Sequence, residues 1–247
     1  MTNRIKIVLI VLIVVLLASM ALGVGLTAAI WDSSSGGTSS GYGPDVKTLD
    51  WNSWDKYFDT SFEVKEGNAT IGYAVKSYDG TNLPDVIFPI SHSGVAVIQI
   101  NNTVFDDDTK KSLPVNVYIS PLITSIQPSA LSNLQNLQTI TFADSGVYTN
   151  TSEQEVVVSG QTITVGAYAL AGCTNLTKIV IEGDRVVKFK AYSLIGCTSL
   201  TRIEFGGTQA QWNAIVKDSG WDAGAGDFKI YCSDKTLNQD GTEYVPA

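Results

Sequence analysis

The sequence is poor in the residues that carry most protein chemistry. Its 247 residues include one histidine and three cysteines, and only 16% are charged, whereas about a quarter of an average soluble domain is charged. The single histidine and the scattered cysteines leave little for metal binding or nucleophilic catalysis, and they do not form a disulfide framework. With seven prolines and 9% aromatic residues, the chain is neither collagen-like nor fully disordered.

The short motifs of the common enzyme classes are also missing. The sequence has no glycine-rich loop of the kind that holds phosphate, no nucleophile elbow and no pair of zinc ligands. His92 has no cysteine or acidic residue at ligand spacing, which indicates a surface turn. The acidic run 106–108 lacks the glycine and distal glutamate of a calcium loop and indicates a solvated turn. We therefore predict that the chain is not an enzyme and holds no cofactor or metal.

Acidic residues outnumber basic ones, and the formal net charge is −8. Arg4 and Lys6 stand before a long apolar run, and the sequence after them holds 14 basic against 24 acidic residues, a balance of −10. An acidic body repels nucleic acid and anionic lipid headgroups. We therefore expect no nucleic-acid partner.

The apolar run covers residues 5–30, which are almost wholly isoleucine, valine, leucine, alanine and glycine. At about 1.5 Å per residue, a helix of this length spans the hydrocarbon core of a bilayer, which is roughly 30 Å thick. The basic residues precede the run and Asp32 follows it, so the positive-inside rule places the N-terminus in the cytoplasm and the body outside. We predict a transmembrane signal-anchor helix over residues 1–31 and a single-pass protein of the cell membrane.

The alternative for this segment is a signal peptide that is removed. The apolar region of a signal peptide has about 7–15 residues, which is shorter than the run observed here. Cleavage would release the body as a secreted protein. Both interpretations place the body outside the cell.

Two short regions lie between this apolar segment and the remainder of the sequence. Residues 32–44 are rich in glycine and serine, which is typical of a flexible linker. Apolar residues recur at roughly helical spacing over residues 45–61 and predict an N-terminal capping helix or turn. The residues at this spacing, which we expect to cover the start of the core, are Val46, Leu49, Trp54, Tyr57 and Phe58, and Trp51 and Trp54 are expected to cap that end of the stack.

An internal repeat is the strongest signal in the sequence. Stretches 123–142, 162–181 and 186–205 align without gaps, and a degenerate earlier unit covers residues 95–119. The aligned apolar columns are Ile126, Val165 and Phe189; Leu131, Leu170 and Leu194; Leu137, Leu176 and Leu200; Ile140, Ile179 and Ile203; and Phe142, Ile181 and Phe205. Because each unit alone exposes an apolar face, the repeat predicts a stack of coils with short parallel strands. We place this solenoid over residues 62–206 and a C-terminal cap and tail over residues 207–247.

The repeated residues carry a family resemblance. Residues 167–179 and 191–203 share the pattern Ala-Tyr-x-Leu-x-Gly-Cys-Thr-x-Leu-Thr-x-Ile, which resembles the BspA-type leucine-rich repeat of surface proteins. The tail from Gly207 to Asp234 resembles the closing segment of that family, and the strands near residues 83–97 resemble its first strands. The resemblance implies a β-rich solenoid of the α/β leucine-rich-repeat type, with short parallel strands and short helical turns. Asn133-Leu134 departs from the pattern by replacing Gly-Cys in the first aligned unit.

The cysteines and tryptophans have structural explanations. Cys173 and Cys197 share a column with Leu134 and are predicted to lie in the core, although adjacent coils would also place them within reach of a disulfide. Cys232 is left as a single thiol. Trp212 and Trp221 are predicted to cover the open end of the solenoid, and stacking against a sugar or peptide is the alternative.

Two functional hypotheses follow from the stack. The first is a surface-displayed binding module that contacts an extracellular protein or glycan through the outward strand residues Thr139, Thr141, Lys178, Val180, Arg202 and Glu204. The resemblance implies a role in adhesion. The second is a structural subunit of a surface or filament, which associates with itself through strand edges at an imperfectly capped end.

Overall fold

The computed structural model describes residues 49–51, 53–80, 83–150 and 152–246, which belong to one compact unit. The predicted membrane segment, residues 1–31, and the predicted linker, residues 32–44, lie outside these residues. Within the described part, no helix has the length and apolar character needed to cross a bilayer.

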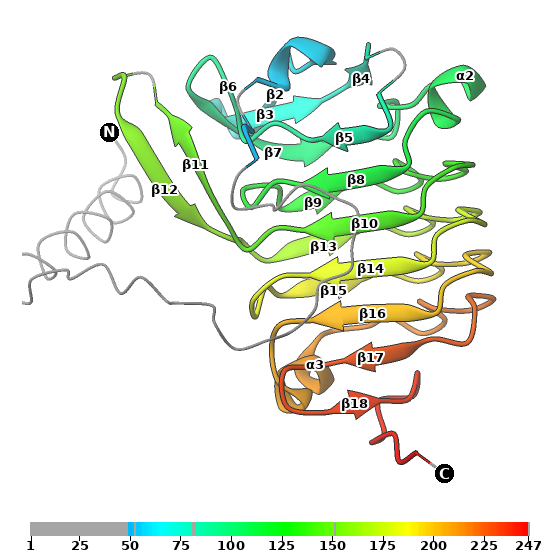
Figure 1. The fold of residues 1–247 in the computed structure, drawn as a ribbon. Coiled ribbons are helices and arrows are strands. Elements are labelled where there is room, and N and C mark those ends of the chain that lie inside the picture. The colour runs from blue at the N-terminus through cyan, green and yellow to red at the C-terminus, as the bar shows by residue number, and fades with distance from the viewer. Residues whose placement is uncertain (1–48, 52, 81–82, 151, 247) are drawn as a thin grey trace, which may run out of the picture. The chain divides into compact units, whose positions relative to one another are not determined.

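The chain winds into stacked coils, and each central coil places one strand in each of two sheets (Figure 1). The front sheet consists of β5 (Asp85–Ile87), β8 (Asn116–Ile119), β10 (Thr139–Phe142), β14 (Lys178–Ile181), β16 (Arg202–Phe205), β17 (Lys229–Tyr231) and β18 (Thr236–Leu237). Neighbouring strands of this sheet are parallel, except for the antiparallel pair β17 and β18. This arrangement confirms the predicted repeat solenoid.

The back sheet lies across the core from the front sheet. It consists of β2 (Phe62–Glu66), β3 (Ala69–Val75), β7 (Val95–Ile100), β9 (Ser125–Ile126), β13 (Ile163–Val165) and β15 (Val187–Phe189), and β6 (Ser91–His92) pairs with β7. The column of Ile126, Val165 and Phe189 lies on its inner face, with each residue at most 1% exposed. The repeat therefore has a second strand in each coil, which the sequence analysis aligned as a column but did not assign to a sheet.

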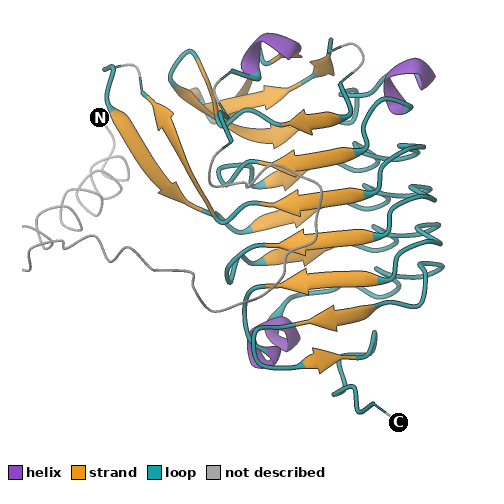
Figure 2. Cartoon of the chain, viewed as in Figure 1, coloured by secondary structure: helices purple, strands orange, loops and turns teal. Residues whose placement is uncertain are grey.

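The shorter elements lie outside these two sheets. They are the 3-10 helix η2 (Asp55–Tyr57), the strand pair β1 (Phe58–Asp59) and β4 (Ser77–Tyr78), the helices α2 (Asp108–Lys111) and α3 (Gln209–Ala214), and the hairpin of β11 (Ser145–Thr149) and β12 (Glu155–Ser159). Among the described residues, the helices lie towards the two ends of the stack, and the middle coils consist of strands joined by turns (Figure 2).

The inward columns form one continuous core between the sheets. Ile140, Ile179 and Ile203 are register partners on adjacent front strands and are fully buried. Leu137, Leu176 and Leu200 are also fully buried in the same cluster. Burial of a leucine or isoleucine side chain contributes roughly 1.5–3 kcal/mol, so the stability of each coil depends on its neighbours.

The repeated Ala-Tyr-x-Leu-x-Gly-Cys segment forms turns rather than a helix. Tyr168 and Gly172 have φ angles of +59° and +71°, and these left-handed residues interrupt any helix at the same points in each coil. Asn133 occupies the position of Gly172 with a φ of +58°. Since asparagine tolerates this conformation better than most residues with a side chain, the departure from glycine preserves the turn.

The C-terminal end of the stack is covered. Trp212 is 1% exposed and Trp221 is 8% exposed, and the ring centroid of Trp221 lies 4.8 Å from that of Phe189 in the last back strand. Helix α3, which carries Trp212, begins with a capping box formed by Thr208 and Gln211. The two tryptophans therefore cap the core, as predicted.

The N-terminal tryptophans are placed differently from the prediction. Trp51 is 3% exposed and packs in a cluster with Ile87, Tyr118 and Ala143. Ile87 and Tyr118 occupy outward positions of the front sheet, so Trp51 covers a side of the stack rather than its end. Trp54 contacts both this cluster and the main core.

A buried arginine connects the corners of several coils. Arg185 is 3% exposed, and its guanidinium donates hydrogen bonds to six backbone carbonyls. The acceptors are the carbonyl oxygens of Ile119, Ser120, Pro121, Ile123, Ala143 and Gln161, at 2.8–3.5 Å. Burial lowers the pKa of Arg185 to about 10, although the nearby carboxylates of Asp144 and Glu182 oppose this shift. The side chain therefore remains charged at neutral pH.

The position of Arg185 is explained by the hairpin β11–β12. This insertion leaves the coil between β10 and β13. At that corner the carbonyls of Ile119, Ser120 and Pro121 also accept backbone N–H groups, whereas within the described residues those of Ile123, Ala143 and Gln161 accept only from Arg185. Arg185 satisfies them from the coil below. A buried carbonyl without a partner costs about 1–3 kcal/mol.

We predict that Arg185→Met destabilises the fold by about 3–5 kcal/mol, because the buried carbonyls of Ile123 and Ala143 lose their donor and the other carbonyls at this corner lose a second hydrogen bond. Chemical denaturation followed by circular dichroism measures the change. The control is Arg202→Met, which removes a side chain that is 44% exposed, and we expect it to cost at most about 1 kcal/mol. Equal decreases in the free energy of unfolding for the two variants would contradict this role of Arg185.

Candidate functional site

The outward face of the front sheet is a grid of side chains in register. One column contains Asp85, Asn116, Thr139, Lys178, Arg202 and Lys229. The next column along the strands contains Ile87, Tyr118, Thr141, Val180, Glu204 and Tyr231. Neighbours within a column are separated by one strand spacing, about 4.8 Å, and neighbours along a strand by about 6.6–6.8 Å.

In the N-terminal half of this face the second column is covered, whereas Asp85 and Asn116 of the first column are partly exposed. Ile87 and Tyr118 are each 5% exposed, beneath the cluster that contains Trp51. Thr141 is 6% exposed, so its placement among the predicted binding residues is corrected. The sequence pattern correctly indicates that Thr141 faces away from the core, but it does not reveal the segments that cover this part of the sheet. Thr139 remains partly exposed at the border.

The C-terminal half of the face is open. Lys178, Val180, Arg202 and Glu204 are all at least partly exposed, as the sequence analysis expected. Strand β17 adds Lys229 and Tyr231. The sequence analysis assigned these two residues to the cap, although the alternation Lys-Ile-Tyr matches the outward–inward–outward pattern of the repeats. We call the six partly exposed residues Lys178, Val180, Arg202, Glu204, Lys229 and Tyr231 the open face.

Arg202 is held in place by two neighbours on the open face. Its Cζ lies 3.8 Å from the ring centroid of Tyr231, and its Nε donates to Oε1 of Glu204 at 2.6 Å. Within the described residues, its two terminal nitrogens have no hydrogen bond and Lys178 has no ion pair. The terminal nitrogens of Arg202 and the ammonium group of Lys178 are therefore available within the described part of the chain to bind a ligand.

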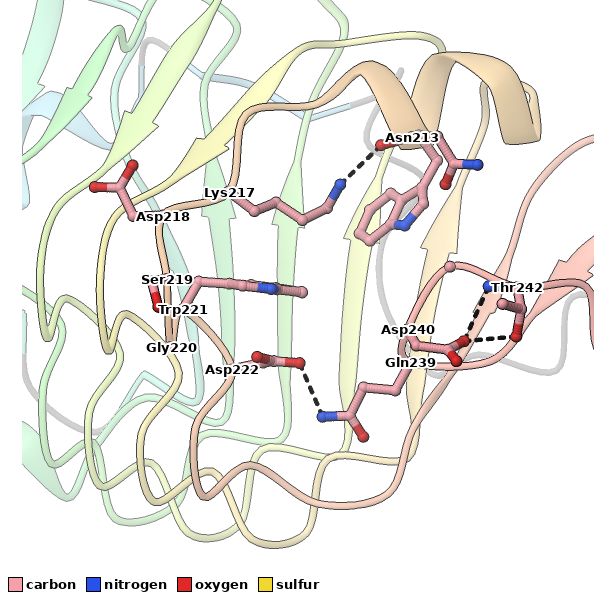
Figure 3. Close-up of a pocket in the computed structure, with 12 residues that line it drawn as sticks. Asn213, Lys217, Asp218, Ser219, Gly220, Trp221, Asp222, Gln239, Asp240 and Thr242 are labelled. Atoms are coloured by element: carbon pink, nitrogen blue, oxygen red, sulfur yellow. Dashed lines mark hydrogen bonds between the residues drawn. The ribbon is translucent and has the colours of Figure 1, made fainter.

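A second candidate site is a pocket of about 640 Å³ at the C-terminal cap (Figure 3). Its lining includes Lys217, Asp218, Asp222 and Asp240, together with edges of the two capping tryptophans. The tryptophans are almost completely buried, so they offer little ring surface for stacking against a ligand.

The charged groups of this pocket already have protein partners. Lys217 Nζ donates to the carbonyl of Trp212 at 2.8 Å and lies 4.6 Å from its ring centroid. Asp222 accepts from Gln239 Nε2 at 3.0 Å, as Figure 3 shows. Asp240 accepts from the backbone N–H and the hydroxyl of Thr242. The bond between Gln239 and Asp222 holds the C-terminal loop against the cap. Because the charged groups of the pocket are engaged within the protein, the open face is the stronger candidate for binding.

The cysteines are core residues without nucleophilic character. All three are free, and the disulfide alternative is not realised. The thiols of Cys173 and Cys197 instead donate to the carbonyls of Leu131 and Leu170 on the preceding coil, at 3.2 and 3.1 Å. Burial raises the pKa of both thiols, that of Cys197 to about 12, which leaves almost no thiolate at neutral pH.

The remaining candidates have structural roles. His92 Nδ1 lies 2.8 Å from a carboxylate oxygen of Asp55 and packs against the ring of Tyr73. Asp107 caps helix α2 by accepting from the backbone N–H of Lys110. In the described ranges, no group of three or more histidine, cysteine or acidic residues is placed to hold a metal ion.

The family comparison agrees with the repeat architecture. The model of the BspA type leucine rich repeat region matches residues 60–147 and 143–215, with six copies. A solved leucine-rich repeat protein from T. pallidum is 13% identical, and the match covers 70% of this chain and 82% of that chain with a TM-score of 0.37. No curated protein matches the sequence. Because the family model covers more than half of the sequence, the chain belongs to the BspA-type leucine-rich repeat family.

Proposed function

We propose that the protein is a surface-displayed module that binds an extracellular protein or glycan through the open face. The observation that carries this proposal is the contrast between the two halves of the outward front sheet. In the N-terminal half the column of Ile87, Tyr118 and Thr141 is buried, whereas in the C-terminal half both columns present charged, aromatic and aliphatic side chains in register.

Family membership supports a binding role. BspA-type leucine-rich repeats are commonly protein-interaction modules of cell surfaces, and leucine-rich repeats are typically not catalytic. A solenoid also suits this role, because its rigid strands present side chains at fixed spacing. The proposal therefore assigns the chain no reaction, and adhesion would follow from binding.

We predict that Val180→Glu weakens ligand binding at least about tenfold, because it places a new charge at the centre of the open face. The full chain in detergent is screened on arrays of extracellular proteins and glycans, and the variant is measured against each hit. Thr164→Glu is the matched control, since Thr164 is a partly exposed outward residue of the back sheet. Binding that is lost equally in both variants, or no binding by the native chain, would contradict the proposal.

The proposal includes attachment to the cell membrane through residues 5–30, with the N-terminus in the cytoplasm. It rests on the length of the apolar run and on the basic residues that precede it. A tethered module binds its partners at a high effective concentration, which compensates for a small binding face.

We expect the mature protein to remain in the membrane fraction with residues 1–31 uncleaved, because the apolar run is longer than a signal-peptide core. N-terminal sequencing of membrane and medium fractions, with external protease digestion of intact cells, tests this. Recovery of a shortened chain from the medium alone would support a secreted module instead.

Self-association is a second candidate function, and one observation favours it. The hairpin β11–β12 forms a two-stranded sheet of its own, so its outer edges have no strand partner within the described residues. Val147 and Val157 are register partners and are 43% and 77% exposed. The exposed hairpin β2–β3 is protected by a bulge and by charged residues such as Lys65, but β11–β12 has neither a bulge nor a lysine.

The hairpin is better suited to self-association than the C-terminal end of the stack, one of the two ends to which the predicted strand-edge pairing could apply. At that end, residues around Lys217 cover the edge of β15, and residues near Glu243 cover that of β18. An antiparallel pair of β12 strands centred on Val157 would place Glu155 opposite Ser159 of the second copy, without a clash of like charges.

We predict that Val157→Lys abolishes any self-association of the full chain in detergent, because an edge lysine opposes strand pairing. Val245→Lys is the matched control, since Val245 is 78% exposed on the C-terminal tail. Analytical ultracentrifugation measures the oligomeric state. A native chain that sediments as a monomer throughout the concentration series would contradict this second function.

A further inference from the structure

We infer that the open face recognises an acidic, extended segment of a partner protein, with Arg202 as the anchor for a carboxylate. This inference rests on the proposed function, because it assigns a ligand chemistry to the same face.

The open face carries the opposite charge from the chain as a whole. The net charge of the protein is −8, yet Lys178, Arg202 and Lys229 follow one another in a single column over three adjacent strands. The acidic residue of the open face, Glu204, lies in the neighbouring column and already accepts a hydrogen bond from Arg202. An acidic ligand is attracted to this column and repelled by the surrounding surface, which fixes where it docks.

Arg202 is oriented before any ligand arrives. Stacking on Tyr231 fixes the plane of the guanidinium, and the bond from Nε to Glu204 fixes its rotation. The two terminal nitrogens are then left to donate in parallel to a carboxylate, which is the geometry that arginine–carboxylate pairs favour. Because the side chain is already held in position, less conformational freedom is lost on binding.

The spacing of the grid favours a peptide over a polyanionic glycan. A carboxylate on Arg202 lies one strand spacing, about 4.8 Å, from the column position of Lys178. Val180 lies diagonally from Arg202, one strand across and two residues along, at about 8 Å. Side chains i and i+2 of an extended peptide are about 6.6–6.8 Å apart, and a glutamate side chain that reaches towards Arg202 spans the difference. The matching sequence is an acidic residue, any residue, and then an apolar residue.

The test uses the full chain in detergent and three synthetic peptides. The first repeats Glu-Ser-Val-Ser three times, the second replaces its glutamates by lysines, and the third replaces its valines by serines. Heparin serves as the polyanionic glycan. Isothermal titration calorimetry at about 50 mM and about 500 mM salt separates charge-dependent from charge-independent binding.

We expect the first peptide to bind, the lysine peptide not to bind and the third peptide to bind several-fold more weakly. High salt should weaken binding by the first peptide. Arg202→Gln should lower its affinity about tenfold, and Arg202→Lys should lower it less, because lysine keeps the charge but loses the two parallel donors. Lys188→Gln, on the outward side of the back sheet, should leave the affinity unchanged. Thermal unfolding of each variant confirms that it is folded.

The inference is overturned if the glutamate and lysine peptides bind equally, if Arg202→Gln has no effect, or if heparin binds through Arg202 while the first peptide does not. The array experiment with Val180→Glu distinguishes this failure from that of the proposed function. If Val180→Glu loses the array ligand but Arg202→Gln keeps it, the open face binds a ligand of different chemistry. If neither variant loses it, the open face is not the binding site.

Discussion

The fold depends on the stacking of coils that cannot hide their apolar residues alone. A coil contributes only short strands, and its inward side chains reach complete burial only between the coils above and below it. Parallel pairing fixes the same residues opposite one another from β8 to β17. A slip of one residue would turn Ile140, Ile179 and Ile203 outward, so the hydrophobic pattern enforces a single register.

The same constraint explains the two irregular features of the stack. The hairpin β11–β12 leaves the repeat path without shifting the register of β10 and β14, because the coil resumes at β13 in the position that the columns require. The cost is a corner of unpaired carbonyls, and Arg185 offsets it from the next coil. A buried charge is tolerated there because its donors are saturated by carbonyl oxygens and two carboxylates lie nearby.

The repeat made the core and the stacking direction predictable from the sequence. Aligned columns such as Leu137, Leu176 and Leu200 identify the inward residues of each coil. Alternation within Lys178–Ile181 identifies the outward residues. Burial of Thr141 could not be predicted in this way, because alternation along a strand shows which residues point outward and not which of them are covered. Lys229 and Tyr231 were missed because β17 lies beyond the last full unit, although its alternation continues the pattern.

The division between inward and outward positions also separates stability from recognition. Inward residues are confined to apolar types by the core, and the left-handed turn positions favour glycine or asparagine, as Gly172 and Asn133 illustrate. Outward residues of the open face are free of both constraints, so neither the core nor the turns require the cations found there in three consecutive coils. The backbone fixes the spacing of these cations. A ligand that binds them must therefore carry complementary charges at the same distances.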